Sequence, residues 1–560
     1  MNAEQKNRRD AVLRRLSKMK NVRANWEGMW AKIAKRADPK YIGLTQNPGA
    51  RAAGYFDLGR QRFDSTILKV VPKWASVVSA ITTPKTEKWH TLTTTEKYFN
   101  EKYSSWLDAA NETLFSRRYA VKAKFEAANR ESLMLLGLYG GAAMSLMRPS
   151  GESKGNFYKT WPLKEWYVDV NFQGEVDTFY RVYETSKRRF LQEFDLETLP
   201  EESKRIINEA SEDKKFNVIC AVYPNEYYDA EVYRAKYKKW AIVYILEESK
   251  EIIEEGGSEV APVFYQRYDV IPDLNDPYPY SPVMMVLADQ AMLNVMARAL
   301  AEASDRAARP MLLGVNEQII NPANIRDGRY IPGAVSEQGQ PLIMPMQYQG
   351  SLPYTLETIN LYKNGINEAY GLDLFQALMQ KPNMTATEIL QQSQMQGIVM
   401  GPVAERRESE FLGPMIELEL YQAFLDGELP MMPPELAKAF LSKEAELKIE
   451  YESPVRRAQR SGELQGLLEV INLALQLSEA DPSARNLINP EAALRKYARV
   501  KGVLESDVFR TKEEAEALNE KAALTAQEQN SLAAGQGEAA MAKDLAQAEA
   551  LSAQNNEVAG

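Results

Sequence analysis

The segment Ser281–Arg309 reads SPVMMVLADQAMLNVMARALAEASDRAAR, and it decides the architecture of the chain. A serine N-cap followed by proline at the first helical position is a strong start signal for a helix. Pro310 ends the run, because proline disfavours the helical conformation in the residue before it. The pattern therefore predicts one continuous helix over this segment.

A single polar stripe runs along this helix. Its members recur at helical spacing, while the rest of the helix is small or apolar; they are Gln290, Asn294, Arg298 and Glu302, continued by Asp305 or Arg306. Such a helix packs closely on most sides and exposes one edge to water. Two interpretations stay open on shape alone. The helix is buried in an enzyme core, or it belongs to a ring of identical helices whose polar edge faces a water-filled channel.

Composition limits the environment of the protein. The chain has 560 residues and a net charge of −9, enough length for several domains. No apolar run reaches the roughly 18 residues that span a bilayer, and Asp289 interrupts the best candidate. We therefore expect no membrane partner, and the charged N-terminus predicts no signal peptide. A single cysteine, Cys220, excludes an internal disulfide and a multi-cysteine zinc site, which is typical of assembly in a reducing cytoplasm.

The catalytic and metal-binding possibilities are few. The one histidine, His90, excludes two-histidine metal motifs and is interpreted as part of a turn that enters a strand. There is no P-loop and no G-x-G-x-x-G after a strand, although a glycosidase-like carboxylate pair is not excluded. We therefore predict no catalytic residue, no metal and no cofactor. The basic first 36 residues predict a helix that either binds a partner or nucleic acid, or forms a solvated surface.

Periodicity predicts a mixed α+β chain that is predominantly helical. Helices are expected over 1–40, from Gly59 to Pro84, twice within 100–138, over 186–194 and over 200–211. Strands are expected over the following ranges: Phe157–Thr160, Trp166–Val170, Thr178–Val182, Phe216–Tyr223, Glu231–Tyr237, Trp240–Glu247 and Val263–Tyr268.

The C-terminal half alternates between helices and a region of different character. Residues 311–353 are rich in proline and glycine, and a helix follows over 354–370. After a loop, Thr385-Ala386-Thr387-Glu388 forms a capping box. The helix it starts is expected to be interrupted at Gly401–Pro402 and at Gly413–Pro414. A strand over Glu446–Tyr451, helices over 458–478 and 491–500, and a low-complexity tail complete the chain.

This order of parts resembles the portal, or head-to-tail connector, proteins of short-tailed bacteriophages (podoviruses). The residues that carry the resemblance are Phe63-Asp64-Ser65-Thr66 with Thr83-Pro84 and Trp89; Asp169…Gly174-Glu175-Val176-Asp177…Tyr180-Arg181; Tyr280-Ser281-Pro282-Val283 with Leu287-Ala288-Asp289; Thr385-Ala386-Thr387-Glu388; Ala404-Glu405-Arg406-Arg407; and Tyr451-Glu452-Ser453-Pro454. The chain departs from the family at Tyr278-Pro279-Tyr280, where a glycine often precedes the Ser-Pro pair.

The resemblance implies a ring-forming fold with named parts. These are a wing over 1–280, stem helices over 281–310 and 354–370, a β-containing clip over 311–353, a tunnel loop over 371–384, a kinked helix returning to the wing over 385–455, a helical crown or barrel over 456–512, and a flexible tail over 513–560. It also implies a homododecamer at one capsid vertex of the virion, assembled in the host cytoplasm. Double-stranded DNA is packaged and ejected through such a ring, which has no enzymatic activity of its own.

The implied partners are the terminase large subunit, tail adaptor proteins, and the scaffolding and major capsid proteins. Arg326, Asp327 and Arg329 are the candidates for docking the terminase and later the tail. Lys381 and Asn383 of the tunnel loop join the stem stripe as candidate DNA-channel residues. DNA must slide, and each phosphate contact adds affinity, so a net acidic wall with sparse cations is expected. Two other classes stay open: a soluble carboxylate-based hydrolase, and a virion scaffold or adhesin that forms no ring.

Overall fold

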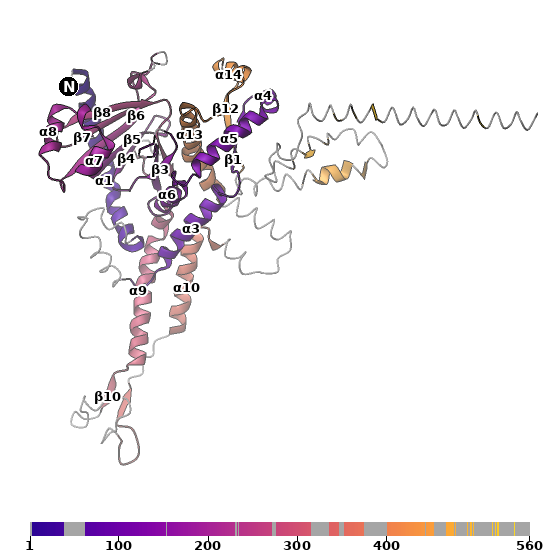
Figure 1. Ribbon diagram of the computed structural model, residues 1–560. Coiled ribbons are helices and arrows are strands. Elements are labelled where there is room, and N and C mark those ends of the chain that lie inside the picture. Colours follow the sequence, from indigo (N-terminus) through magenta and orange to yellow (C-terminus); the bar gives the residue numbers. More distant parts are fainter. Residues whose placement is uncertain are drawn as a thin grey trace, which may run out of the picture. The chain divides into compact units, whose positions relative to one another are not determined.

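The computed structural model describes most of the first 452 residues (Figure 1). The described ranges are 3–38, 62–149, 151–152, 154–229, 232, 234–270, 276–314, 335–345, 352–373, 400–442 and 444–452, with separate positions between 466 and 543. The chain divides into two units, Met1–Gly466 and Leu467–Gly560. All elements discussed below belong to the first unit. The predicted helices over 458–478 and 491–500 lie largely outside the described residues.

A five-stranded antiparallel sheet forms one side of the first unit, in the order β4-β5-β6-β7-β8. Its strands are β4 (Trp166–Val170), β5 (Val176–Ser186), β6 (Lys215–Pro224), β7 (Trp240–Leu246) and β8 (Glu251–Ser258). Two short helices, α7 (Lys187–Glu193) and α8 (Glu201–Glu209), connect β5 to β6. One face of the sheet is covered by α1 (Ala3–Ala37), whose Val12, Leu16 and Met19 are buried against it.

The main core lies between α1, the sheet and three more helices. These are α3 (Thr66–Thr82), α6 (Phe125–Tyr139) and the first turns of α9 (Pro282–Ala308). A second sheet, in the order β3-β2-β9, packs under α6. Its strands are β2 (Gly141–Met147), β3 (Phe157–Thr160) and β9 (Val263–Arg267).

A second core joins segments that lie far apart in the sequence. Strand β1 (His90–Thr94) pairs antiparallel with β12 (Leu447–Tyr451). Helices from both halves of the chain bury apolar side chains here: α4 (Lys97–Lys102), α5 (Ser104–Arg118), α13 (Gly413–Leu425) and α14 (Pro434–Leu441). The region after residue 400 is therefore fixed to the N-terminal body, and the predicted strand over 446–451 is confirmed.

Most predicted elements are confirmed, and several details differ. Helix α3 begins at Thr66 rather than near Gly59, and helix α14 was not anticipated. Residues Ala235–Tyr237 form a short 3-10 turn rather than a strand. Strands β2 and β8 were not anticipated. Gly401–Pro402 does not interrupt the helix among the described residues, which are helical from Met400 onward. The irregularity is instead a π-helical turn over Glu408–Leu412 (η5), directly before the predicted break at Gly413–Pro414.

Candidate functional site

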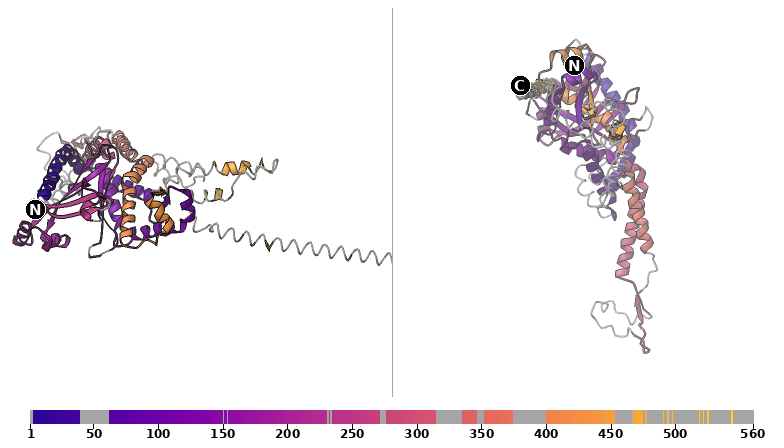
Figure 2. Two further views of the ribbon diagram at one scale, coloured as in Figure 1. Left: turned by 90° about the horizontal axis from the view of Figure 1, so that it is seen from above. Right: turned by 90° about the vertical axis from the view of Figure 1, so that its right-hand side faces the viewer.

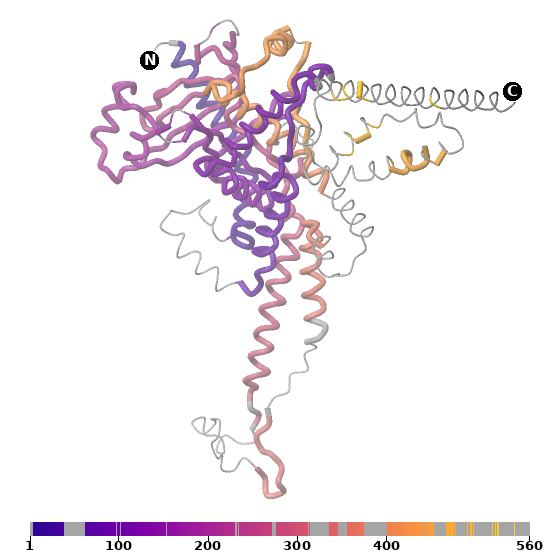
Figure 3. Tube along the Cα trace, turned by 45° about the vertical axis from the view of Figure 1, so that its right-hand side comes forward, coloured from indigo at the N-terminus to yellow at the C-terminus, as the bar shows by residue number. Residues whose placement is uncertain are grey.

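Helices α9 and α10 (Leu352–Ala369) form a hairpin that projects from the body (Figures 1 and 2). They run side by side, and the short antiparallel pair of β10 (Leu312–Gly314) and β11 (Ile343–Pro345) lies at their far end (Figure 3). The predicted helix over Ser281–Arg309 is therefore continuous, and the segment after it contains a β ladder.

The start of α9 is fixed by local contacts. The Ser281 hydroxyl accepts a hydrogen bond from the Met284 backbone N–H at 3.4 Å, as the N-cap prediction required. Gly140 ends α6 with φ of 83°, and a Cβ there would lie 2.5 Å from the Tyr280 carbonyl oxygen. Only glycine, which has no Cβ, fits this close approach. The contact between Gly140 and Tyr280 therefore places the start of α9 directly beside the end of α6.

The returning helix α10 is anchored at its body end. Ile366 and Tyr370 are buried, with 0% and 2% of their surfaces exposed. The Tyr370 hydroxyl donates to the Gly137 carbonyl at 2.9 Å, and its ring meets Trp74 of α3 edge-on at 5.8 Å between centroids. Both helices of the hairpin are therefore held by the α3–α6 core.

The polar stripe of α9 divides into two parts. The Asn294 side-chain oxygen accepts from the backbone N–H groups of Phe63 and Asp64, at 2.8 and 3.3 Å. The Gln290 amide donates to the Asp64 carboxylate at 3.4 Å, and Gln290 is 3% exposed. This half of the stripe binds the segment before α3 in the same chain. Gln290 is therefore buried rather than open to solvent, and the Asn294 side chain binds a segment of its own chain.

The other half of the stripe is open to solvent. Arg298 and Glu302 form an i, i+4 ion pair at 2.8 Å, and their side chains are 62% and 48% exposed. The Arg298 guanidinium lies over the Phe63 ring at 5.6 Å. Arg298 lowers the pKa of the Glu302 carboxyl, so this pair presents one positive and one negative charge. The local charge is therefore balanced.

An apolar face adjoins this pair. Met285, Met292 and Val295 are 61%, 48% and 61% exposed, and helical geometry places them within about 80° of one another around α9. On α10, Leu356 and Leu361 are 49% and 70% exposed. Apolar side chains gathered in this way mark an interaction surface.

Length and composition alone would let α9 cross a membrane, and it is the one helix among the described residues that passes this test. One such helix is weak support, because a core helix of a soluble protein passes as well. The first turns of α9 are buried among the body's own residues, including Val283, Val286 and Leu293.

Several predicted site residues lie outside the described residues. These are Lys381 and Asn383 of the loop after α10, and Arg326, Asp327 and Arg329 of the segment between β10 and β11. Of the six predicted channel residues, the structure therefore places four, all on α9. It leaves two of those, Arg298 and Glu302, exposed.

A buried ionic network was not anticipated from the sequence. Arg118 of α5 and Glu419 of α13 form a two-pronged ion pair in which both side chains are 0% exposed. The Tyr158 hydroxyl also donates to Glu419, and Arg118 donates to His90 Nε2 at 2.8 Å. Burial is the largest single influence and opposes the charge on Arg118, but the charge and hydrogen bonds of Glu419, together with Tyr158 and Tyr119, raise the pKa of the guanidinium overall. The network ties the two halves of the chain together.

His90 is a structural residue of this network. Its ring stacks on Phe115 at 4.7 Å, and the side chain is fully buried. Burial, followed by the charge of Arg118, holds the pKa of His90 well below its ordinary 6.5. The imidazole is therefore neutral and accepts the Arg118 hydrogen bond.

This environment predicts an acid-sensitive fold. Below about pH 6.5 the unfolded chain binds a proton at His90 that the folded chain excludes. The free energy of unfolding should therefore fall as pH drops from about 6.5 toward the lower folded pKa, by about 1.4 kcal/mol per pH unit from this residue. Denaturant titrations of the wild type and His90→Gln across this range measure the difference. If the free energy of unfolding changed with pH in the same way for the wild type and for His90→Gln, this prediction would be wrong.

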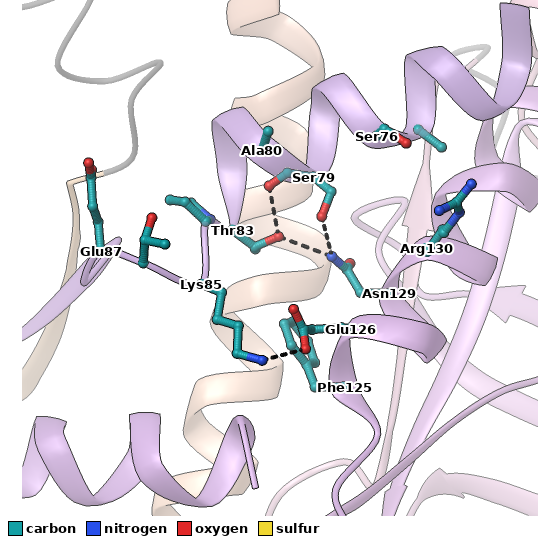
Figure 4. Close-up of a pocket in the computed structure, with 13 residues that line it drawn as sticks. Ser76, Ser79, Ala80, Thr83, Lys85, Glu87, Phe125, Glu126, Asn129 and Arg130 are labelled. Carbon is teal, nitrogen blue, oxygen red and sulfur yellow. Dashed lines mark hydrogen bonds and ion pairs between the residues drawn. The ribbon is translucent and has the colours of Figure 1, made fainter. Parts of the chain in front are cut away.

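A cleft lies between the end of α3 and the start of α6 (Figure 4). Its volume is about 520 Å³. The Asn129 amide donates to the hydroxyls of Ser79 and Thr83 at 3.2 and 3.0 Å, and Lys85 pairs with Glu126 at 2.9 Å. These polar groups satisfy one another, so the cleft does not point to a ligand.

The described residues do not assemble a catalytic or metal-binding arrangement. No group of three or more His, Cys, Asp or Glu side chains suitable for a metal occurs among them. Gly151-Glu152-Ser153-Lys154-Gly155 has the letters of a hydrolase nucleophile elbow. It connects β2 to β3, however, whereas that motif requires a strand followed by a helix.

Comparison with known proteins shows which family the chain belongs to. A family model described as "Bacteriophage head to tail connecting protein" matches residues 9–508. The chain therefore belongs to the family of bacteriophage head-to-tail connecting proteins, a structural rather than an enzymatic family.

The relatives include two phage proteins. The portal protein of Salmonella phage epsilon15 is 24% identical over 566 aligned positions, which cover 96% of this chain and 95% of the relative. The probable portal protein of Bordetella phage BPP-1 is 24% identical, covering 82% of this chain and 81% of the relative. A chain from the virion of a native gene transfer agent particle aligns with 12% identity over 60% of this chain and 73% of its own, at a TM-score of 0.31.

Proposed function

We propose that this chain is the subunit of a dodecameric portal ring at one vertex of a phage capsid. Double-stranded DNA enters the head through this ring during packaging and leaves through it during ejection. Family membership over residues 9–508 and the exposed apolar face of the α9–α10 hairpin support the proposal. The family resemblance compares residues 281–310 and 354–370 with a stem, and residues 311–353 with a clip. Helices α9 and α10 of the hairpin would be that stem, and the β10–β11 end would belong to the clip.

The apolar face of the hairpin gives the ring its driving force. Fully burying one Val, Leu or Met side chain stabilises an assembly by about 1.5–3 kcal/mol. Met285, Met292 and Val295 of one copy would pack against α10 of the next, where Leu361 is 70% exposed. A closed ring repeats this contact at every subunit boundary and leaves no unpaired face.

The edge of α9 beside this face would line the channel. Arg298 and Glu302 would place rings of alternating charge around the DNA, which limits net phosphate attraction and lets the duplex slide. Lys381 and Asn383 would add a ring of weak contacts from the tunnel loop over 371–384. Arg326, Asp327 and Arg329 of the clip would dock the terminase large subunit and afterwards the tail adaptors.

The remaining parts take the other portal roles. Residues 1–280 form the wing that meets the major capsid and scaffolding proteins, and 385–455 return the chain to it. Residues 456–512 form the crown or barrel, and 513–560 form the tail. Assembly takes place in the host cytoplasm before the ring enters the virion.

The location of the chain tests this function directly. Antibodies against the purified protein, applied to DNA-filled and emptied particles, should label one vertex per particle, at the tail junction. Labelling of several vertices, or of the distal end of the tail, would exclude a portal role. A particle without label in either state would place the chain outside the virion.

The tunnel-loop assignment makes a separate prediction for Lys381→Ala. Rings should form normally, since in this assignment Lys381 faces the channel and takes no part in a subunit boundary. Packaged DNA should be retained less well, because one weak, salt-screened phosphate contact per subunit is lost. DNA retention in packaged heads, measured with ring yield, checks this outcome. Loss of ring assembly would place Lys381 in an interface instead of the channel.

A further inference from the structure

A small pocket lies between the N-terminal turns of α1 and strands β5 and β6. Its volume is about 230 Å³, and its lining includes Arg8 and Arg15 from α1 with Tyr180 from β5 and Tyr223 from β6. Tyr227, in the turn after β6, closes one side. Two arginines and three tyrosines are thus among the ten residues that line the pocket, and none of the ten belongs to the α9–α10 hairpin.

Two buried groups in this pocket have no acceptor for an N–H or O–H that they could donate. They are the Tyr180 hydroxyl and one terminal nitrogen of Arg8, Nη2. Tyr180 is 0% exposed, and the Arg8 side chain is 9% exposed. Buried polar groups are nearly always hydrogen-bonded. Glu255 Oε1, from the carboxylate that pairs with Arg8, is buried and unpartnered as well, so the clearest missing acceptor is the one beside the Tyr180 hydroxyl.

The charges around the pocket favour an anion. The Arg8 and Arg15 guanidinium carbons lie over the rings of Tyr227 and Tyr223, at 5.3 and 5.5 Å from the centroids. The carboxylate paired with Arg8 belongs to Glu255, at an N–O distance of 3.8 Å, which is longer than a hydrogen bond. Glu226 also lines the pocket, as an exposed residue. The carboxylates of Asp169 and Asp177 also act electrostatically on Tyr180 and Arg15, so the two cations, which the aromatic rings position, are partly neutralised.

The protonation state of Tyr180 fits the same ligand. Burial raises the pKa of its hydroxyl, and the charge and side-chain hydrogen bond of Arg15 offset only part of this rise. The hydroxyl is therefore protonated at neutral pH and can donate. Arginine side chains donate only, so the pocket offers N–H and O–H donors to a ligand that accepts.

We propose that this pocket is an oxyanion site, which binds a single carboxylate or phosphate group between Arg8, Arg15 and Tyr180. Both groups accept several hydrogen bonds and match the planar guanidinium fork. The site does not depend on the proposed portal function. It would give the α1 face of the five-stranded sheet a specific contact for an anionic group on a ligand or partner.

The site is tested on the full-length protein with sodium phosphate and with sodium acetate, each against sodium chloride at equal ionic strength. Calorimetric titration should show saturable binding of at least one of the two anions. Tyr180→Phe should weaken that binding about tenfold, because one hydrogen bond to a charged group is lost. It should leave the fold intact without anion, since the hydroxyl donates to no acceptor there.

Two further variants separate the site from general charge effects. Arg15→Gln should weaken binding at least as much as Tyr180→Phe. Arg14→Gln is the matched control: Arg14 is exposed on the same helix, and its Nε donates to the Asp10 carbonyl at 3.2 Å. It should bind like the wild type.

The anion that binds identifies the chemistry of the natural ligand. Binding of phosphate alone assigns a phosphate group, binding of acetate alone assigns a carboxylate, and binding of both assigns a general oxyanion pocket. Each of these results supports the site if Tyr180→Phe and Arg15→Gln weaken it. Binding of neither anion, or equal binding by all variants, overturns it.

Discussion

Replacing Glu419 with glutamine is expected to lower the free energy of unfolding of the subunit by about 3–5 kcal/mol, because it leaves the buried Arg118 charge without its counter-charge. Both side chains are 0% exposed, so water cannot take the place of the carboxylate. Denaturant unfolding followed by tryptophan fluorescence measures the change. Trp89 reports on this core, since the Arg118 guanidinium lies 4.6 Å from its ring.

The matched control is Glu126→Gln, in the exposed pair with Lys85. Those side chains are 56% and 60% exposed, and such pairs contribute about 0–1 kcal/mol. A double variant, Arg118→Met with Glu419→Met, should be more stable than Glu419→Gln, because it removes both charges together. Equal effects of Glu419→Gln and Glu126→Gln would show that the buried network does not hold the two halves of the chain together.

Replacing Val295 with lysine is expected to abolish ring assembly while the subunit stays folded. Val295 is 61% exposed in the single chain, and lysine is a good helix former, so the fold loses little. In the proposed ring the new ammonium group would be buried against the next copy, at a cost of several kcal/mol at each boundary. Sedimentation velocity of the purified variant measures the loss.

Val121→Lys is the matched control for this substitution. Val121 is 93% exposed in the connection between α5 and α6, away from the hairpin. This variant should assemble like the wild type. Rings of normal yield from Val295→Lys would show that the apolar face of α9 lies outside the subunit boundary.

Elements whose ends are set by a capping residue or a proline could be predicted from the sequence. The Ser281–Pro282 start and the Pro310 stop predicted α9, because caps and proline act within a few residues. Strands β3 and β4 were predicted to the residue. Strand β2 was missed because its Gly141, Ala142 and Ala143 have low strand propensity, yet tertiary packing buries them completely.

Long-range contacts could not be predicted from one sequence. Arg118 and Glu419 are 301 positions apart, and no spacing rule relates them. The polar stripe of α9 was read as a single surface, but the segment at Phe63–Asp64 covers half of it. The family resemblance did come from the sequence, because it depends on the order of parts rather than on any one contact.

In the proposed assembly the chain closes into a ring through its α9–α10 hairpin. Electron microscopy and native mass measurement of the purified full-length protein test it most directly. Closed dodecameric rings, with the hairpins of neighbouring copies packed around a central channel, are the predicted result. A monomer or an open aggregate, at concentrations where wild-type heads package DNA, would contradict the account.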